Sequence, residues 1–374
     1  MCMKKILLFQ VEIAGHALEY IKHLYSWAKL EKSNEYVFCI PKNKLTNALY
    51  NDTSHVNIQF LQVSENRHIL SAKDKCLLLR NYIKQVNPTD VILLSFDQYL
   101  PYFNFLLPRD IHYSSFLYYL YIYNWKELNF KMKVRTWINN YLLFHNKSVK
   151  NILICNGTDE AALFNEKFKT SKFINIVDPI AIETPPAVVK KNIDKLTFLH
   201  MGALAKRKGT LDILNAISII PSDKLSKMKF VFMGKISDNI KEHFYKVLED
   251  VKEKADIVVR DEFCSFEEIC QACSVANYLL MPYYDTSQSS GMLAYASAFN
   301  LPVVATNKGM IKKLVEKYKL GYLIDNGVES LAQFITNALC SVPCEISRTY
   351  IEKNSIANFI STFHRCFNDD DNIR

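Results

Sequence analysis

The sequence predicts an α/β protein with two facing Rossmann-like domains, and three observations support this fold class. Short apolar runs alternate with longer amphipathic stretches along the chain, which is the pattern of parallel sheets covered by helices on both faces. The pattern begins again after the proline-containing segment ETPPAVVKKN at residues 183–192, which reads as a linker. The length of 374 residues suffices for two domains.

Each apolar run of strand type is assigned in chain order. The expected strands of the first half are residues 4–10, 36–40, 56–63, 90–96, 151–156 and 172–177. The expected strands of the second half are residues 195–202, 229–234, 255–260, 276–282 and 301–306. Apolar residues at helical spacing predict helices between them, for example at residues 18–30, 72–84, 211–220 and 240–252.

Composition and charge narrow the class of protein. Apolar residues make up 49% of the chain and charged residues 22%, as in an ordinary globular protein and unlike a disordered or fibrous one. Residues 1–178 contain 22 Lys and Arg against 15 Asp and Glu. This excess indicates an anionic partner of the first half, or it serves solubility alone.

The cysteines and the apolar runs indicate a cytoplasmic protein. Ten cysteines are scattered without a framework, which suits reduced thiols. Cys270 and Cys273 form a single CxxC after Cys264, and helix packing explains it better than zinc because no second ligand pair is present. The uncharged, tyrosine-rich run at residues 111–125 has 15 residues, fewer than the roughly 20 of a membrane-spanning helix.

Candidate binding residues lie directly after strands, because ligands bind at the carboxyl ends of parallel sheets. The first strand is followed by VEIAGH and not by GxGxxG, and no Walker A, GxSxG or HExxH motif occurs. These absences argue against a nicotinamide or flavin enzyme. The only acidic cluster of the Asp-x-Asp kind, residues 369–371, lies in the polar tail, so we expect no metal site.

Three loops after strands are suited to hold a phosphate group. They are Ala14-Gly15-His16, the segment from Gly202 to Gly209 with Lys206, Arg207 and Lys208, and the stretch Ser287–Gly291 before a helix. Each has a purely structural interpretation as well. Serines at a helix start are most often caps, and a Lys-Arg-Lys run is most often a solvated turn. All three loops follow strands that face one cleft, and this joint placement favours a ligand-binding function.

The second half resembles the nucleotide-sugar domain of family 4 glycosyltransferases, which have two facing Rossmann-like domains (the GT-B fold). The matching segments are FLHMGALAKRKGTLDILNAI, FVFMGK, FCSFEEICQACSVANYLLMPY and SSGMLAYASAFNLPVVATNKGMIKKLVEKYKLGYLI. The resemblance implies an acceptor domain at residues 1–182, a donor domain at 183–346, and a segment 347–374. In that last segment, a helix at about residues 348–366 would cross back onto the first domain.

The resemblance also assigns roles to residues. Lys208 would neutralise the donor diphosphate, and Phe263 would lie where the nucleotide base is held. Residues 289–292 would hold the distal phosphate through backbone amides, and His112 would lie near the transferred sugar. The complete expected donor set is Gly15, His16, Gly202, Arg207, Lys208, Phe263, Ser287, Gln288, Ser289, Ser290, Gly291, Met292 and Tyr295.

Some positions depart from the family pattern. Ser287 and Tyr295 stand where the family usually has two glutamates, which contact the sugar and the ribose. Ala203 stands where an arginine is usual, and Arg207 could substitute for it. These departures leave two alternatives to an active enzyme: an inactive glycosyltransferase-like partner protein, or a nucleotide-sugar epimerase.

The implied activity is hexosyl transfer from a UDP- or GDP-sugar to a hydroxyl of a glycan or lipid-linked acceptor. The resemblance implies retention of configuration without a metal or another cofactor. Catalysis would rest on electrostatic stabilisation of the leaving diphosphate and on domain closure. No nucleic acid partner is expected.

Residues 103–150 suggest where the acceptor lies. They are dense in aromatics and contain seven basic against two acidic residues, a composition that suits a membrane interface. They could equally form a wall of the first domain. We expect a peripheral protein on the cytoplasmic face of the inner membrane.

Overall fold

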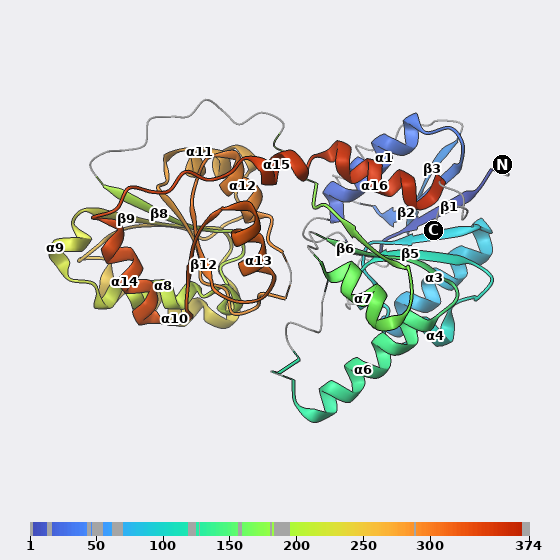
Figure 1. Cartoon of the computed structure of the whole chain (residues 1–374), viewed down its shortest axis with the longest axis horizontal. Coiled ribbons are helices and arrows are strands. Elements are labelled where there is room, and N and C mark those ends of the chain that lie inside the picture. Colours follow the sequence, from blue (N-terminus) through green and yellow to red (C-terminus); the bar gives the residue numbers. More distant parts are fainter. Residues whose placement is uncertain are drawn as a thin grey trace. The chain divides into compact units, whose positions relative to one another are not determined.

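The computed structural model describes residues 3–12, 17–42, 46, 55–61, 70–118, 125–126, 128–155, 159–179, 182, 195–287 and 289–368. The chain forms two compact units (Figure 1). Unit 1 comprises Met1–Pro179 and Ile356–Arg374, and unit 2 comprises Ile180–Ser355. The expected boundaries after residues 182 and 346 therefore fall at Pro179 and Ser355. The expected linker at 183–192 lies outside the described residues.

Unit 1 contains a seven-stranded sheet in the order β3-β2-β1-β4-β5-β6-β7, with every pairing parallel. Its strands are β1 (Lys5–Phe9), β2 (Glu35–Pro41), β3 (Val56–Leu61), β4 (Asp90–Leu93), β5 (His112–Phe116), β6 (Val149–Cys155) and β7 (Phe173–Ile176). The strand order reverses between β1 and β4, which places a crevice at their carboxyl ends.

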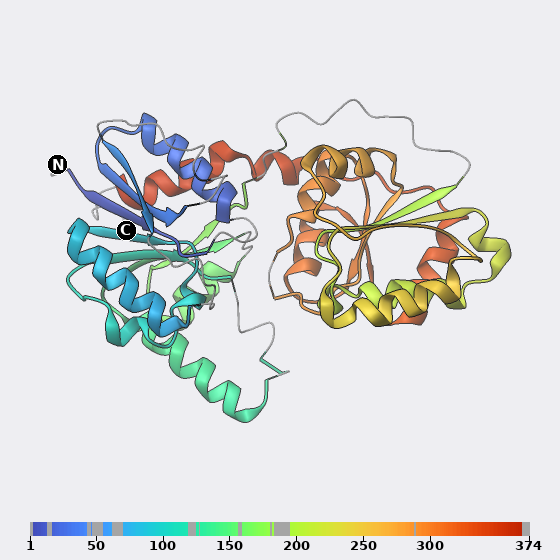
Figure 2. The ribbon, with the colours of Figure 1, turned by 180° about the vertical axis from the view of Figure 1, so that it is seen from behind.

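Helices cover both faces of this sheet, as the views from the front and from behind show (Figures 1 and 2). They are α1 (Ala17–Leu30), α3 (Ala72–Val86), α4 (Phe103–Leu106), α6 (Phe130–His145), α7 (Glu160–Phe168) and α16 (Ile356–Asn368), with a 3-10 turn η1 (Phe96–Gln98). The helices α1 and α16 share one aromatic core, in which the ring centroids of Trp27 and Phe363 lie 5.8 Å apart.

The end of the chain differs in one respect from the single helix expected at residues 348–366. Two helices occur there: α15 (Thr349–Lys353) in unit 2 and α16 in unit 1. The break lies at Asn354, whose side-chain amide donates to the carbonyl oxygen of Tyr350 at 2.8 Å and so ends α15. The expected return of the chain to the first domain is confirmed by α16.

Unit 2 contains a six-stranded parallel sheet in the order β10-β9-β8-β11-β12-β13. Its strands are β8 (Leu196–Met201), β9 (Met228–Met233), β10 (Asp256–Arg260), β11 (Tyr278–Met281), β12 (Val303–Thr306) and β13 (Gly321–Ile324). Phe230, Phe198 and Tyr278 stack across three neighbouring strands, with 5.4 Å between successive ring centroids. This ladder fixes the register of the central strands.

The core beside this ladder lies under α8, α10 and α14. The helices of unit 2 are α8 (Thr210–Ile219), α9 (Ser222–Leu225), α10 (Asp238–Val251), α11 (Phe266–Val275), α12 (Met292–Ala298), α13 (Gly309–Tyr318), α14 (Val328–Ala338) and α15, with a 3-10 turn η2 (Lys206–Lys208). Alternation of strands and helices in both units confirms the predicted α/β class.

Candidate functional site

The turn η2 is fixed against the end of β11 by a glycine. Gly209 ends the turn with φ of +68°, and a Cβ atom added there would lie 2.2 Å from the carbonyl oxygen of Pro282. Only glycine therefore permits this close approach. The amide of Tyr284 donates to the carbonyl oxygen of Arg207 at 2.9 Å. The loops after β8 and β11 are thereby joined, and the three cations of η2 are held at the carboxyl edge of the sheet.

Lys208 is an almost buried cation at this edge, 8% exposed. Its Nζ lies 5.1 Å from the centroid of the Tyr283 ring. A Cβ atom added to Gly202 would lie 3.0 Å from this Nζ and 3.8 Å from Sδ of Met292. The structure thus brings Gly202, Lys208 and Met292 together. No acidic partner of Lys208 occurs in the described part of the chain, and a buried cation without one favours an anionic ligand.

His200 lies buried at the end of β8, close enough for the charge of Lys208 to affect it. Its ring is buried, with Nδ1 2.9 Å from the Leu280 carbonyl oxygen and Nε2 2.9 Å from Oγ1 of Thr210. Burial, with a further contribution from the Lys208 charge, lowers the pKa of His200 to about 4, so the ring is neutral at pH 7. A carbonyl oxygen only accepts, so the proton lies on Nδ1, and the unprotonated Nε2 faces the Thr210 hydroxyl, which also lies 3.2 Å from the Ala205 carbonyl oxygen.

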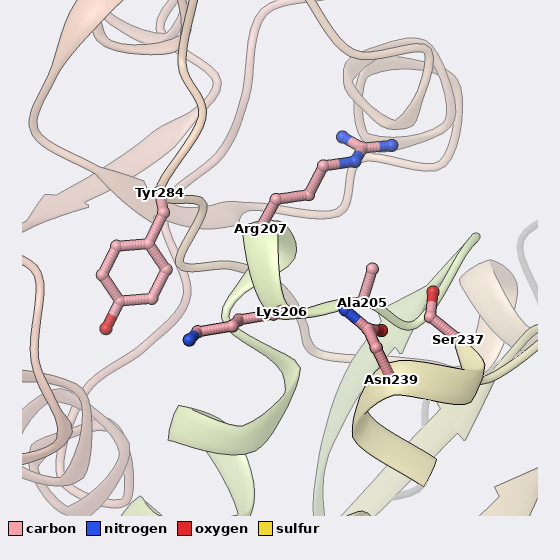
Figure 3. Close-up of a pocket in the computed structure, with 6 residues that line it drawn as sticks. All are labelled: Ala205, Lys206, Arg207, Ser237, Asn239 and Tyr284. Carbon is pink, nitrogen blue, oxygen red and sulfur yellow. The ribbon is translucent and has the colours of Figure 1, made fainter. Parts of the chain in front are cut away.

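A hollow of about 460 Å³ lies beside η2 (Figure 3). It is lined by Ala205, Lys206, Arg207, Ser237, Asn239 and Tyr284. Ser237 begins α10, and its hydroxyl makes no cap hydrogen bond. The side chains of Arg207 and Lys206 point in different directions (Figure 3). Arg207 lines this hollow. Lys208, the next residue in the chain, is not among the lining residues.

The serine-rich turn leads into α12. Gly291 has φ of −57° and precedes the helix, which begins at Met292. The Met292 amide donates to Oγ of Ser290 at 3.4 Å, and the Leu293 amide donates to the Ser290 carbonyl oxygen at 3.0 Å. Ser289 and Ser290 are half-buried, and Gln288 lies outside the described residues. Ser290 thus makes one long side-chain contact with the first turn, while Gly291, at the N-cap position, provides no side-chain cap.

Comparisons with known proteins show what this chain is similar to. Residues 195–341 match the family described as glycosyl transferases group 1. The chain is also 28% identical over 180 residues to an uncharacterized glycosyltransferase of Haemophilus influenzae. That match covers 46% of this chain and 47% of the relative, so it spans about half of the relative's length.

Solved structures show the fold of the whole chain. One is WaaG, a glycosyltransferase involved in lipopolysaccharide biosynthesis, with a TM-score of 0.66 at 13% identity, covering 98% of this chain and 96% of WaaG. Another is HepE of Anabaena, solved in complex with UDP and glucose, with a TM-score of 0.63 at 13% identity, covering 97% of this chain and 95% of HepE. The two α/β units therefore have the GT-B fold.

Unit 2 uses Ser287 in a way that sequence reasoning missed. This serine is fully buried, and its amide and hydroxyl both donate to Oδ1 of Asp285, at 3.1 and 2.6 Å. The acidic group nearest in sequence to the missing family glutamate is thus Asp285, two residues earlier. The Asp-x-Ser spacing, which is typical of an Asx turn, was the available signal.

Two aromatic side chains of the expected donor set in unit 2 differ in their exposure. Phe263, after β10, is 91% exposed. The ring of Tyr295 lies 6.2 Å from that of Phe266, whose side chain is 44% exposed. The Phe263 ring is therefore open to contact a planar ligand, whereas Tyr295 is half-buried. In the described parts of both units, no group of three or more His, Cys, Asp or Glu side chains could hold a metal ion.

In unit 1, His112 does not lie where the prediction requires it. His112 is the first residue of β5, and its Nδ1 lies 3.8 Å from Oδ1 of Asp90, the first residue of β4. Both residues are at the amino ends of parallel strands, opposite to the edge where ligands bind. The prediction of His112 near the sugar is therefore wrong. Gly15 and His16 lie outside the described residues.

The carboxyl edge of the unit 1 sheet carries a buried polar group that the sequence did not reveal. The Tyr20 hydroxyl donates to Oδ1 of Asp178 at 2.6 Å and lies 3.2 Å from Sγ of Cys155. Burial, with the charge of Asp178, raises the pKa of Tyr20 well above its ordinary value. At the same edge, the buried Lys75 pairs with Glu12 at 2.8 Å. These residues come from separate elements, so no motif marks them.

Proposed function

We propose that the protein transfers a hexosyl group from a nucleoside-diphosphate sugar, such as a UDP- or GDP-sugar, to a hydroxyl of a glycan or lipid-linked acceptor. The observation that carries this proposal is Lys208, a nearly buried cation without an acidic partner in the described residues, set at the strand ends of a glycosyltransferase domain. A donor diphosphate would supply the missing anion. The UDP and glucose bound to HepE, which has the same fold, support this donor class.

The chain's own residues would act by charge and position. The Lys208 ammonium would stabilise the negative charge that develops on the leaving diphosphate as the bond to the sugar breaks. Arg207 would reach oxygens of the same group, because a guanidinium can bind two of them at once. Gly202 lets the ligand approach the Lys208 Nζ closely. We propose retention of the anomeric configuration and no metal requirement, since these cations supply the positive charge.

The base and the sugar would be held by other loops of the same domain. The exposed ring of Phe263 would stack on the base. The turn at Ser289–Met292 would lie along the distal phosphate and the sugar, as the family resemblance implies. We further propose that the protein works on the cytoplasmic face of the inner membrane as a peripheral protein, where a lipid-linked or growing glycan is available.

The experiment is incubation with radiolabelled UDP- and GDP-sugars, with and without membrane extracts as acceptor. We expect transfer to a lipid-extractable or polymeric product, and slow donor hydrolysis in its absence. Neither transfer nor hydrolysis with any donor would contradict the proposed activity and favour an inactive partner protein. Conversion of the free donor into an epimer would favour an epimerase instead.

A further inference from the structure

The helix α6 is held at one end only. In Figures 1 and 2 it runs away from the sheet of unit 1. Its buried residues, Asn140, Leu143 and Phe144, lie in its last two turns. Phe144 packs against three rings at 4.6 to 6.2 Å, and the ammonium of Lys172 donates to the Phe144 carbonyl oxygen at 3.1 Å. Residues 130–139 contain no buried side chain. The second half of α6 is therefore anchored in unit 1, whereas its first half has no buried side chain.

The projecting half carries an apolar stripe. It consists of Phe130, Val134, Trp137, Ile138 and Tyr141, which are 82%, 41%, 55%, 43% and 44% exposed. Separations of four, three, one and three residues place these side chains on one face of a helix. Along the stripe, the rings of Trp137 and Tyr141 stack at 5.4 Å, and those of Tyr141 and His145 at 4.1 Å. Exposed apolar surface gathered in this way marks an interaction site.

The sequence around the apolar stripe, from residue 128 to residue 150, is rich in basic residues. From residue 128 to residue 150 the sequence contains no Asp or Glu and five basic residues: Lys131, Lys133, Arg135, Lys147 and Lys150. Helical geometry places Lys133 on one side of the stripe and Lys131 and Arg135 on the other. These three cations have no acidic partner in the part of the chain that the structure describes. Apolar rings between two rows of cations match an anionic lipid surface.

We propose that the α6 stripe docks the protein on an anionic bilayer, with the helix lying in the interface. Trp and Tyr rings are suited to headgroup depth, and the flanking cations would contact lipid phosphates. Self-association through the stripe would set like charges against each other. No helix in the described residues is long and apolar enough to cross a membrane. This inference deepens the proposed function, because it names the surface that would bring unit 1 to a lipid-linked acceptor.

The experiment is flotation of the full chain with phosphatidylcholine vesicles, with or without phosphatidylglycerol, at low and high salt. We expect binding only to the anionic vesicles and only at low salt. The triple variant Lys131→Glu, Lys133→Glu, Arg135→Glu should bind on the order of 100-fold more weakly, from about 1 kcal/mol for each cation. The matched control is Lys73→Glu, Arg80→Glu, Lys84→Glu on α3, which changes the net charge equally and should bind like the wild type.

A second set of variants tests the stripe itself. Phe130→Ser, Trp137→Ser and Ile138→Ser together should abolish binding without lowering the melting temperature, because these side chains are exposed. The control replaces Leu77, Tyr102 and Phe105, also exposed on unit 1, by Ser. Unchanged binding of either α6 variant, equal binding to neutral vesicles, or a stripe-dependent dimer by light scattering would overturn the docking proposal. UDP binding, measured without vesicles, reports on the proposed function separately.

Discussion

Gly202 shows how one backbone position can control the candidate donor site. Its φ of +92° favours glycine, and a Cβ there would come within 3.0 Å of Nζ of Lys208. Gly202→Ala should therefore push the ammonium aside and weaken nucleoside-diphosphate binding about tenfold or more, the effect of losing a hydrogen bond to a charged group. The control is Gly327→Ala, which has φ of +130° but only Glu329 nearby, at 3.7 Å. Equal affinity in both variants, by calorimetry, would remove Gly202 from the site.

His200 makes stability depend on pH. Its pKa of about 4 in the folded state lies below the ordinary value of about 6.5. As the pH falls from 6.5 to 4, the unfolded chain binds a proton that the folded chain does not, so stability is lost across that window and is fully present above it. The loss is about 3 kcal/mol. Urea unfolding from pH 7 to pH 4 should show a smaller decrease for His200→Gln; an identical decrease would contradict this assignment.

At the scale of elements, runs rich in apolar residues predicted most strands, whereas β5 and β13 were missed. Each of the eleven apolar runs assigned as strands coincides with an observed strand, because strands buried on both faces consist of apolar residues. The strand β5 was missed because HYSSF has buried serines, one of which, Ser114, accepts from the Asn151 side chain at 3.0 Å. Such cross-strand pairs depend on tertiary packing that a single run of sequence does not display.

The candidate site, like the strands, was predictable only in part. Lys208 and the loop at Gly202 could be found because a cation cluster directly after a strand is visible in sequence. The hollow beside Arg207 and the Tyr20–Asp178 pair could not, because each joins residues from different elements. His112 was misplaced because only the strand boundaries show that it begins β5.

The helix α16 is predicted to be essential for unit 1. Phe363 is fully buried against Trp27 of α1. Phe363→Ala should lower the free energy of unfolding of unit 1 by about 3–5 kcal/mol, the cost of a large cavity. Phe105→Ala, at a side chain that is 67% exposed, should change it by less than about 0.5 kcal/mol. Chemical unfolding followed by tryptophan fluorescence measures both; equal stability would show that α16 is dispensable.

At the scale of the whole molecule, the proposed chemistry relies on the charges of side chains. Lys208 and Arg207 would supply the positive charge that many transferases take from a divalent ion. Transfer should therefore persist in excess EDTA. Complete loss of activity that manganese restores would contradict this account of the leaving group.

The central claim is that unit 2 binds a nucleoside diphosphate through Lys208. The most direct measurement is calorimetric titration of the wild type, Lys208→Ala and Lys206→Ala with UDP and GDP. Lys206 is the matched control because it is an exposed cation on the same turn. We predict binding of one nucleotide by the wild type, a loss of about 1.5–3 kcal/mol for Lys208→Ala, and a much smaller change for Lys206→Ala. Unchanged affinity of Lys208→Ala, or no binding of either nucleotide by the wild type, would contradict the claim.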